Sequence, residues 1–287
     1  MPMLADLVQN IVGHRVAIML SAVWLGGAAG AAGQTPVSAV EAERPTIYYI
    51  GDSTVRNGGG NGGNGQWGWG DHTGMYLDTT TVRIANRALG GRSSRTYLTE
   101  GRWGRVLEDL KRGDVVVIQF GHNDGGLVND TSRARGTLRG IGEEIVEIDN
   151  LMTGEHEVVH TYGWYLRRYI ADTRGRGATP VIASLVTRNI HDEGRFVRNK
   201  ESYAGWAEAV ARAEGIPFLD LNELIAREYD RLGGATVAGL FQGDHTHTNL
   251  EGARLNARIV IGALNGLEDN PVAPYLSAEG RAVEGLR

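Results

Sequence analysis

The chain has 287 residues, with 29 Lys and Arg against 34 Asp and Glu, and this net charge of −5 argues against a nucleic-acid binder, which needs a basic face to displace counterions from phosphate. Hydrophobic residues make up 41% of the sequence, so the chain can bury a core and wholesale disorder is excluded. Cysteine is absent, which excludes disulfides, thiolate zinc sites, iron–sulfur clusters and cysteine nucleophiles.

The N-terminal residues have the pattern of a secretory signal. His14 and Arg15 precede an apolar run over residues 16–25, and a stretch of Gly and Ala follows it. A basic residue, a short apolar segment and a small-residue site are typical of a cleaved signal, and the run is too short to span a bilayer. We therefore predict a signal peptide over residues 1–33, a linker over 34–44 and a secreted or periplasmic bacterial protein. The alternative is a cytosolic protein with an unusual N-terminal helix.

The rest of the chain alternates between short apolar runs and longer amphipathic segments. The apolar runs predict five buried strands, at Thr46–Ile50, Val82–Ala85, Val115–Phe120, Pro180–Leu185 and Pro217–Leu219. The amphipathic segments predict helices over Gly101–Lys111, His156–Arg174, Lys200–Glu214, Leu221–Leu232 and Leu250–Leu264. This alternation predicts an α/β fold, in which helices cover both faces of a parallel sheet. We expect one domain over residues 45–267 and a C-terminal tail over 268–287.

Four polar clusters follow the predicted strands or precede the last helix. They are Gly51-Asp52-Ser53-Thr54, Asn86 with Gly90-Gly91-Arg92-Ser93, Gly121-His122-Asn123-Asp124 and Asp244-His245-Thr246-His247. Ligands of open parallel sheets bind outside the carboxyl ends of the strands. The clusters therefore predict a single site at that edge of the sheet.

Ser53, His247 and Asp244 supply the three side chains that nucleophilic catalysis by serine needs. A serine hydroxyl is a poor nucleophile at neutral pH unless an imidazole accepts its proton, and a carboxylate orients that imidazole. Asp244 lies three residues before His247, so one tight loop can bring the carboxylate to the imidazole ring. The alternatives are a helix-capping role for Ser53 or Asp244, and His245 as the base.

Attack on a carbonyl also needs hydrogen-bond donors for the oxyanion that develops. The candidate donors are the backbone N–H groups of Ser53 and Gly91 and the side-chain amide of Asn123. Glycine at position 91 lets the backbone approach the substrate closely. We expect Asp52 to organise its turn and His122 to be a hydrogen-bonded packing residue.

These clusters match, in order, the four blocks of the SGNH or GDSL hydrolase superfamily, and the sequence around them resembles the rhamnogalacturonan acetylesterases. The resemblance covers about Pro45 to Gly266 and includes the glycine run Asn57–Gly65, Trp67-Gly68-Trp69-Gly70, Gly91-Arg92-Ser93-Ser94-Arg95 and Asp244-His245-Thr246-His247-Thr248. It implies a flavodoxin-like three-layer α/β/α sandwich with a five-stranded parallel sheet. The implied reaction removes acetyl esters from the rhamnogalacturonan backbone of pectin through an acetyl-serine intermediate.

The resemblance implies no metal and no organic cofactor. The partner it implies is an acetylated pectic polysaccharide or oligosaccharide. We expect no nucleic-acid partner, no membrane span after signal cleavage, and a monomer. The sequence departs from fungal members of the family in lacking cysteine and in having a longer stretch over Asn129–Thr153. Because that stretch is expected to border the substrate cleft, another acetylated polysaccharide, xylan or homogalacturonan, is the alternative substrate.

Four further residues are candidates for substrate binding. Arg92 and Arg95 can pair with galacturonate carboxylates, since guanidinium groups match carboxylate geometry. Trp67 and Trp69 can form a platform on which a sugar stacks. The alternatives are a solvated arginine pair and tryptophans that pack in the core or at its rim.

Two other function classes compete with the esterase interpretation. His156-Glu157-Val158-Val159-His160 fits H-E-x-x-H, which on a helix places two imidazoles on one face for zinc, so a zinc metalloprotease is possible. The segment Thr153-Gly154 marks the expected helix entry, and no third ligand follows at a typical spacing. A catalytically dead sugar-binding module would lack a key residue, yet all of the motif residues are present.

Overall fold

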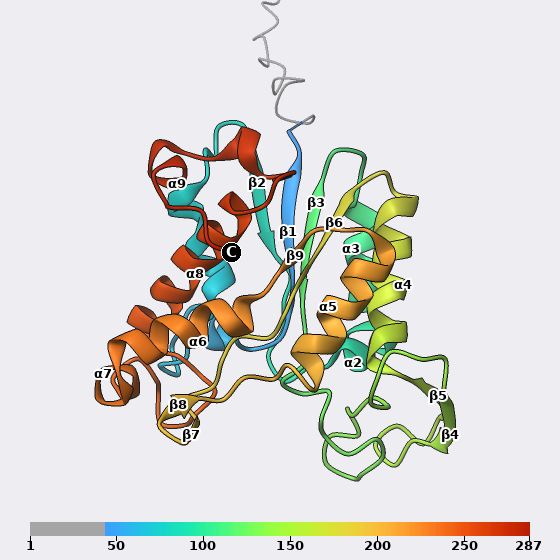
Figure 1. Cartoon of the computed structure of the whole chain (residues 1–287). Coiled ribbons are helices and arrows are strands. Elements are labelled where there is room, and N and C mark those ends of the chain that lie inside the picture. The colour runs from blue at the N-terminus through green and yellow to red at the C-terminus, as the bar shows by residue number, and fades with distance from the viewer. Residues whose placement is uncertain (1–43) are drawn as a thin grey trace, which may run out of the picture. The chain divides into compact units, whose positions relative to one another are not determined.

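A five-stranded parallel sheet forms the centre of the structure, a computed structural model that describes residues 44–287 (Figure 1). Its strands are β1 (Thr46–Gly51), β2 (Arg83–Asn86), β3 (Val115–Gln119), β6 (Thr179–Ala183) and β9 (Phe218–Leu219), in the spatial order β2-β1-β3-β6-β9. Each neighbouring pair is parallel. The predicted fold class is confirmed, and the predicted strands lie within two residues of the observed ones.

Helices cover both faces of the sheet because successive side chains of a strand point to opposite sides. In β1, Ile47 and Tyr49 belong to a core shared with α6 (Leu221–Leu232) and α8 (Leu250–Asn265). Tyr48 and Ile50 belong to a second core, shared with α3 (Arg102–Asp109), α4 (Tyr162–Gly175) and α5 (Tyr203–Glu214). Figure 1 shows these two groups of helices on opposite sides of the sheet. The result is the predicted three-layer α/β/α sandwich.

Shorter elements complete the described part of the chain. They are the 3-10 helices η1 (Gly58–Gly60), η2 (Trp69–Tyr76) and η3 (Ala273–Tyr275), the helices α2 (Ser94–Thr99), α7 (Gly234–Ala238) and α9 (Ala278–Arg281), and two hairpins, β4 (Ile145–Asp149) with β5 (His156–His160) and β7 (His191–Asp192) with β8 (Arg195–Phe196). Both hairpins lie toward the carboxyl end of the central sheet in Figure 1.

The helix predicted over His156–Arg174 begins only at Tyr162, so its first six residues were predicted wrongly. His156–His160 is the strand β5, antiparallel to β4. Burial alternates along β5, with Val158 exposed and Val159 fully buried, which is the period of a strand. The helix starts where the Thr161 side chain accepts a hydrogen bond from the Trp164 N–H, an N-cap that the periodicity of the downstream residues did not reveal.

Residues 268–287 are part of the domain, although the sequence indicated a tail. Val272 is fully buried in the core shared with α6 and α8, and Leu276 forms a β-bridge with Leu77. The Leu286 N–H donates to the Gly262 carbonyl at 2.8 Å. No helix within residues 44–287 is long and apolar enough to cross a membrane. The predicted signal peptide and nearly all of the predicted linker lie outside the described residues.

Candidate active site

The turn after β1 presents Ser53 at the carboxyl edge of the sheet. The Asp52 Oδ1 atom accepts hydrogen bonds from the N–H and the hydroxyl of Thr54, each at 2.8 Å, which agrees with the predicted turn-organising role. A Cβ at Gly51 would lie 2.5 Å from the carbonyl oxygen of Gln119, so glycine alone fits where β1 meets β3. Asp52 is fully buried, and burial raises the pKa of its carboxyl.

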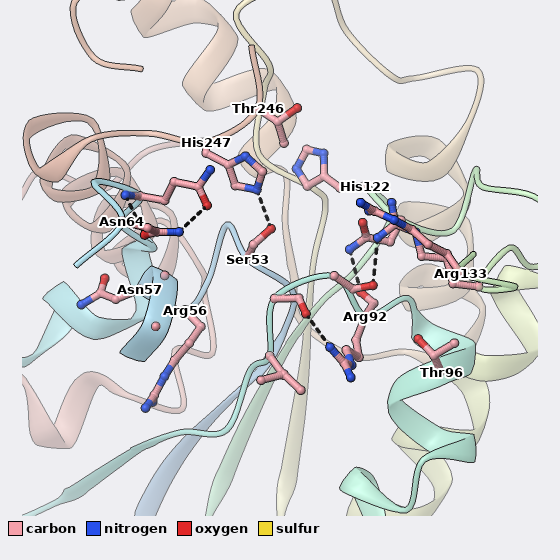
Figure 2. Close-up of a pocket in the computed structure, with 18 of the residues that line it drawn as sticks. Ser53, Arg56, Asn57, Asn64, Arg92, Thr96, His122, Arg133, Thr246 and His247 are labelled. Carbon is pink, nitrogen blue, oxygen red and sulfur yellow. Dashed lines mark hydrogen bonds between the residues drawn. The ribbon is translucent and has the colours of Figure 1, made fainter. Parts of the chain in front are cut away.

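The structure brings Ser53, His247 and Asp244 into one hydrogen-bonded chain. The Ser53 hydroxyl lies 2.9 Å from His247 Nε2, and His247 Nδ1 lies 2.6 Å from Asp244 Oδ2 (Figure 2). Because Ser53 follows β1 and His247 precedes α8, residues 194 positions apart meet at this edge. His245, the alternative base, contributes its backbone carbonyl to Asn189 and does not take part in this chain.

The loop itself orients Asp244. Its Oδ1 atom accepts from the N–H of Thr246 at 2.6 Å and from the N–H of His247 at 2.7 Å. Partial burial raises the pKa of Asp244, but the hydrogen bonds from His247 and from these two N–H groups outweigh burial, so that the pKa is lowered overall. An ionised carboxylate at this position fixes the His247 tautomer with the proton on Nδ1.

The three predicted oxyanion donors line the same cavity. Gly91 has a φ of +79°, a left-handed conformation that favours glycine. The Asn123 amide donates one hydrogen bond to the Arg92 carbonyl at 2.8 Å, which leaves its second N–H for another acceptor. Within residues 44–287, the N–H groups of Ser53 and Gly91 have no hydrogen-bond acceptor. Three donors are thus available near the Ser53 hydroxyl.

A buried carboxyl that the sequence analysis did not single out anchors the loop of Asn123. Asp124 accepts from the N–H of Ser94 at 3.0 Å, the hydroxyl of Ser94 at 2.5 Å and the N–H of Gly121 at 3.0 Å. Burial raises the pKa of Asp124 to about 7 despite these donors. The contacts tie the loop after β3 to the start of α2, which fixes the backbone on either side of Asn123.

The prediction of a hydrogen-bonded His122 was wrong. His122 lines the cavity, and neither of its ring nitrogens has a partner among the described residues, although both are buried. Burial lowers the pKa of His122 well below the usual value, and the positive charge of Arg188 lowers it further. The ring is therefore a neutral wall of the site beside His247 (Figure 2).

Around these groups opens a cavity of about 930 Å³. Its charged lining consists of one carboxylate, Glu100, and five arginines: Arg56, Arg92, Arg133, Arg135 and Arg188. The predicted Arg92 is among them, where it pairs with Glu100 at 3.0 Å. The site is therefore cationic, although the whole chain carries a net charge of −5.

Three predicted substrate-binding residues do not line the cavity. Arg95 is fully buried, and its guanidinium pairs with Glu157 and donates to two backbone carbonyls. Trp69 is also buried, with its indole N–H on Gln119 at 2.8 Å. Trp67 packs against the His72 ring, and the backbone at Gly62 covers it. The prediction that Arg95 and Trp69 bind the substrate was wrong, because both side chains are buried in the interior.

The H-E-x-x-H motif does not have the geometry that a zinc site needs. On strand β5 its two histidines are four residues apart along an extended chain, so they do not meet as they would on a helix. His156 contacts Asp149 and Glu147, His160 stacks on Trp164, and Glu157 binds Arg95. Within residues 44–287, no group of three potential ligands lies close enough to hold a metal ion. The helical geometry on which the zinc alternative depended is contradicted.

Arg56, Arg133, Arg135 and Arg188 are cavity residues that the sequence analysis missed. Arg133 and Arg135 come from the long Asn129–Thr153 stretch, which was expected to border the cleft without any residue being named. Arg135 donates to the Gly91 carbonyl at 3.0 Å, and Arg188 donates to the His122 carbonyl at 3.1 Å. A search for arginines soon after the carboxyl ends of strands would have found Arg56 and Arg188, but not Arg133 and Arg135, which lie well beyond the end of β3.

Several known proteins are similar to this chain in sequence or in fold. The profile of the GDSL-like lipase/acylhydrolase family matches residues 49–255. The chain is 34% identical to the rhamnogalacturonan acetylesterase of Emericella nidulans over 83% of this chain and 93% of that protein. It is 30% identical to the probable rhamnogalacturonan acetylesterase YesY of Bacillus subtilis over 77% and 93%, respectively. The crystal structure of Bacillus subtilis YxiM is similar, with 26% identity and a TM-score of 0.62, and the match covers 77% of this chain and 56% of that one.

Proposed function

Because the chain belongs to the GDSL-like lipase/acylhydrolase family and is a carboxylic ester hydrolase, we propose that it removes acetyl groups from rhamnogalacturonan, with Ser53 as the nucleophile. The observation that carries the mechanism is the hydrogen-bonded chain from Ser53 through His247 to Asp244, which opens on the cavity. A hydroxyl, an imidazole and a carboxylate in this order are the parts of a serine esterase.

In the first half of the reaction, Ser53 Oγ attacks the acetyl carbonyl carbon and its proton passes to His247 Nε2. The N–H groups of Ser53 and Gly91 and the Asn123 amide stabilise the oxyanion. When the tetrahedral intermediate collapses, the sugar oxygen takes the proton from His247 and leaves, and the acetyl group remains on Ser53. In the second half, His247 Nε2 removes a proton from a water molecule while the water oxygen attacks the acetyl carbon. The bond to Ser53 Oγ then breaks, the proton passes from His247 to Ser53 Oγ, and acetate leaves.

The cationic cavity and the named relatives together support a pectic substrate. Rhamnogalacturonan carries galacturonate, and a cleft with five arginines and one carboxylate attracts such a polyanion. Two relatives that align over most of their length are named for this substrate. An esterase for a plant polymer must meet it outside the cell, so the proposal includes export by the predicted signal peptide over residues 1–33.

The test is acetate release from acetylated rhamnogalacturonan, with acetylated xylan as the matched neutral polymer. The full chain without its first 33 residues is expected to release acetate from the pectic substrate with a kcat/KM at least about 10-fold above that for xylan, which corresponds to about 1.4 kcal/mol. If xylan is the preferred substrate, the proposed mechanism stands and the proposed substrate is wrong. If the chain hydrolyses neither polymer and also fails to hydrolyse p-nitrophenyl acetate, the proposed activity is contradicted.

A further inference from the structure

The long loop between β3 and β4 has a side chain that faces the cleft with no protein partner. Arg133 is exposed and lines the cavity, and within residues 44–287 its guanidinium forms neither a hydrogen bond nor an ion pair. The other four cavity arginines each donate to a backbone carbonyl or pair with a carboxylate. Arg133 is the cavity arginine whose donors are all available to a ligand.

The turn that carries Arg133 is rigidly built. Asp130 accepts hydrogen bonds from the N–H groups of Ser132, Arg133 and Ala134, at 2.6, 2.7 and 3.1 Å. Ala134 is almost fully buried and has a φ of +39°, a left-handed conformation that costs a non-glycine residue energy. The surrounding structure holds this strained backbone, which directs the neighbouring Arg133 outward into the cleft.

Arg95 and Glu157 clamp the base of this loop. The buried Arg95 guanidinium donates to the carbonyls of Val128 and Gly136, at 2.7 and 2.8 Å, and so joins the two ends of the loop. Glu157 accepts from Arg95 at 2.7 Å, which ties both ends to strand β5. A Cβ at Gly136 would lie 2.1 Å from the Gly126 carbonyl, so the two ends also approach more closely than any other residue allows.

The electrostatics of the site favour an anion beside Arg133. Arg133 and Arg135 are close enough that the charge of Arg133 lowers the pKa of Arg135, an effect second only to burial. Ser132, next to Arg133, also lines the cavity, and its hydroxyl donates to Asp130 Oδ1 at 2.6 Å. Figure 2 shows Arg133 at the same opening as Ser53, His122 and His247. The carboxylates of Asp52, Asp124 and Asp130 raise the pKa of Arg135 and offset part of this effect. A bound carboxylate would interact favourably with both guanidinium groups.

We propose that Arg133 binds a galacturonate carboxylate of the polymer. The inference rests on the proposed function, because it names the part of the pectic substrate that the loop recognises. Arg135, by contrast, donates to the Gly91 carbonyl at 3.0 Å and so anchors the backbone of the Gly91 loop. Arg133 itself makes no contact with the Ser53, His247 and Asp244 chain, so it acts on substrate choice.

The experiment compares two forms of one substrate. Acetylated rhamnogalacturonan oligosaccharides are used with free galacturonate carboxylates and after methyl esterification, which removes the charge. For the wild-type chain we expect kcat/KM to be about 10-fold higher for the free form than for the esterified form, chiefly because the free form has the lower KM. Arg133→Gln is expected to lower this ratio of the two kcat/KM values about 5- to 10-fold, Arg133→Lys to lower it less, and 0.5 M salt to lower the wild-type ratio.

Arg139→Gln is the matched control, because Arg139 lies in the same loop, outside the cavity, over the Trp206 ring. It removes the same charge and is expected to leave the ratio unchanged. Equal ratios for the wild type and Arg133→Gln, or an equal fall in both variants, would overturn the proposal.

A second measurement separates this proposal from the proposed function. Oligogalacturonate without acetyl groups is tested as a competitive inhibitor of p-nitrophenyl acetate hydrolysis. We expect inhibition of the wild type and of Arg139→Gln, with an inhibition constant at least about 5-fold weaker for Arg133→Gln. If the wild type releases no acetate from rhamnogalacturonan but shows this pattern, the substrate assignment fails and the carboxylate site stands. The same constant in all three chains would contradict the carboxylate site, whatever the substrate.

Discussion

At the scale of single residues, the hydroxyl of Ser53 is the atom on which the proposed chemistry depends. It lies within hydrogen-bond distance of one imidazole nitrogen, at 2.9 Å. Ser53→Ala is expected to lower kcat for p-nitrophenyl acetate and for the pectic ester by roughly 10³-fold or more, because no nucleophile remains. The thermal midpoint should stay within a few degrees of wild type, since half-buried Ser53 caps no helix. Near wild-type turnover by the purified, folded variant would sink the assignment.

In the proposed mechanism the Asn123 amide stabilises the oxyanion, and the same amide donates to the Arg92 carbonyl. Asn123→Ala is expected to lower kcat about 10²- to 10³-fold, the typical cost of removing one oxyanion donor. Steady-state kinetics with p-nitrophenyl acetate, which lacks a sugar, provide the measurement. A rise in KM without a change in kcat would instead assign Asn123 to substrate binding.

The buried, unpartnered ring of His122 predicts a pH-dependent stability. Its pKa is lowered in the folded chain, so below the unfolded value of about 6.5 the unfolded state binds a proton that the folded state does not. Stability linked to His122 is complete above about pH 6.5 and is lost as the pH falls toward the folded pKa. His122→Asn removes this loss. Calorimetry gives the thermal midpoint of the wild type and of His122→Asn at pH 5 and at pH 8. The wild-type midpoint minus the variant midpoint should be several degrees lower at pH 5 than at pH 8. A difference that does not depend on pH would contradict the prediction.

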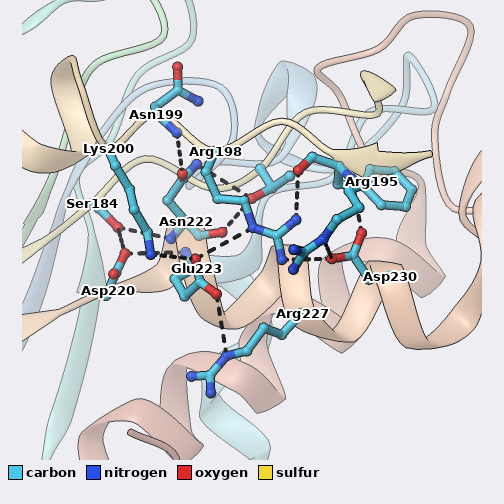
Figure 3. Close-up of polar contacts among 12 residues, drawn as sticks. Ser184, Arg195, Arg198, Asn199, Lys200, Asp220, Asn222, Glu223, Arg227 and Asp230 are labelled. Carbon is cyan, nitrogen blue, oxygen red and sulfur yellow. Dashed lines mark hydrogen bonds and ion pairs between the residues drawn. The ribbon is translucent and has the colours of Figure 1, made fainter. Parts of the chain in front are cut away.

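At the scale of elements, an ion-pair network attaches the β7–β8 hairpin to helix α6 (Figure 3). Asp230 pairs with Arg198 at 2.7 Å and accepts from the Phe196 N–H at 2.9 Å, and Glu223 pairs with Lys200 at 3.0 Å. The loop that leads into this hairpin includes Asn189, whose N–H donates to His245 at 2.8 Å. The segment that precedes the hairpin is thus hydrogen-bonded to the loop that carries His247.

Asp230→Asn tests this network, because the amide can still accept from Phe196 but loses its charge. We expect a loss of about 1 kcal/mol of unfolding free energy, measured by urea denaturation, and a smaller loss in 1 M salt, where ion pairs are screened. Asp192→Asn is the control, since Asp192 lies in the same hairpin, is exposed and has no ion pair among the described residues. Similar losses for both variants would show that the network adds no stability.

At the scale of the whole molecule, the C-terminal residues complete the core. Val272 is fully buried and Leu276 nearly so, and both pack with residues of α8 and with Leu77. Deletion of residues 268–287 is expected to lower the thermal midpoint by more than about 10 °C or to prevent folding, because several buried apolar side chains are lost together. Leu276→Ala, which keeps the rest of the chain, should cost about 2–5 kcal/mol by calorimetry. A deletion variant with an unchanged midpoint would restore the interpretation of this segment as a tail.

The sequence by itself was sufficient for the sheet and for the chain of Ser53, His247 and Asp244. The buried strands are apolar at most positions, so they stand out in the sequence, and parallel connections bring their carboxyl ends to one edge. Short motifs at those ends therefore lie close together, whatever the conformation of the loops between them. The proposed catalytic geometry belongs to this part of the molecule, and it could be predicted from position alone.

Only the tertiary structure decided which polar residues face the cavity and which support it. Arg92 and Arg95 are three residues apart in one motif, yet the first lines the cleft and the second is buried against Glu157. The H-E-x-x-H segment has the same composition on a helix or a strand, and its pairing with β4 made it a strand. Arg133 has no local signal, because its place over the cleft depends on contacts of the loop with residues far away in the chain. Burial, pairing and loop position are long-range properties, and no local pattern contains them.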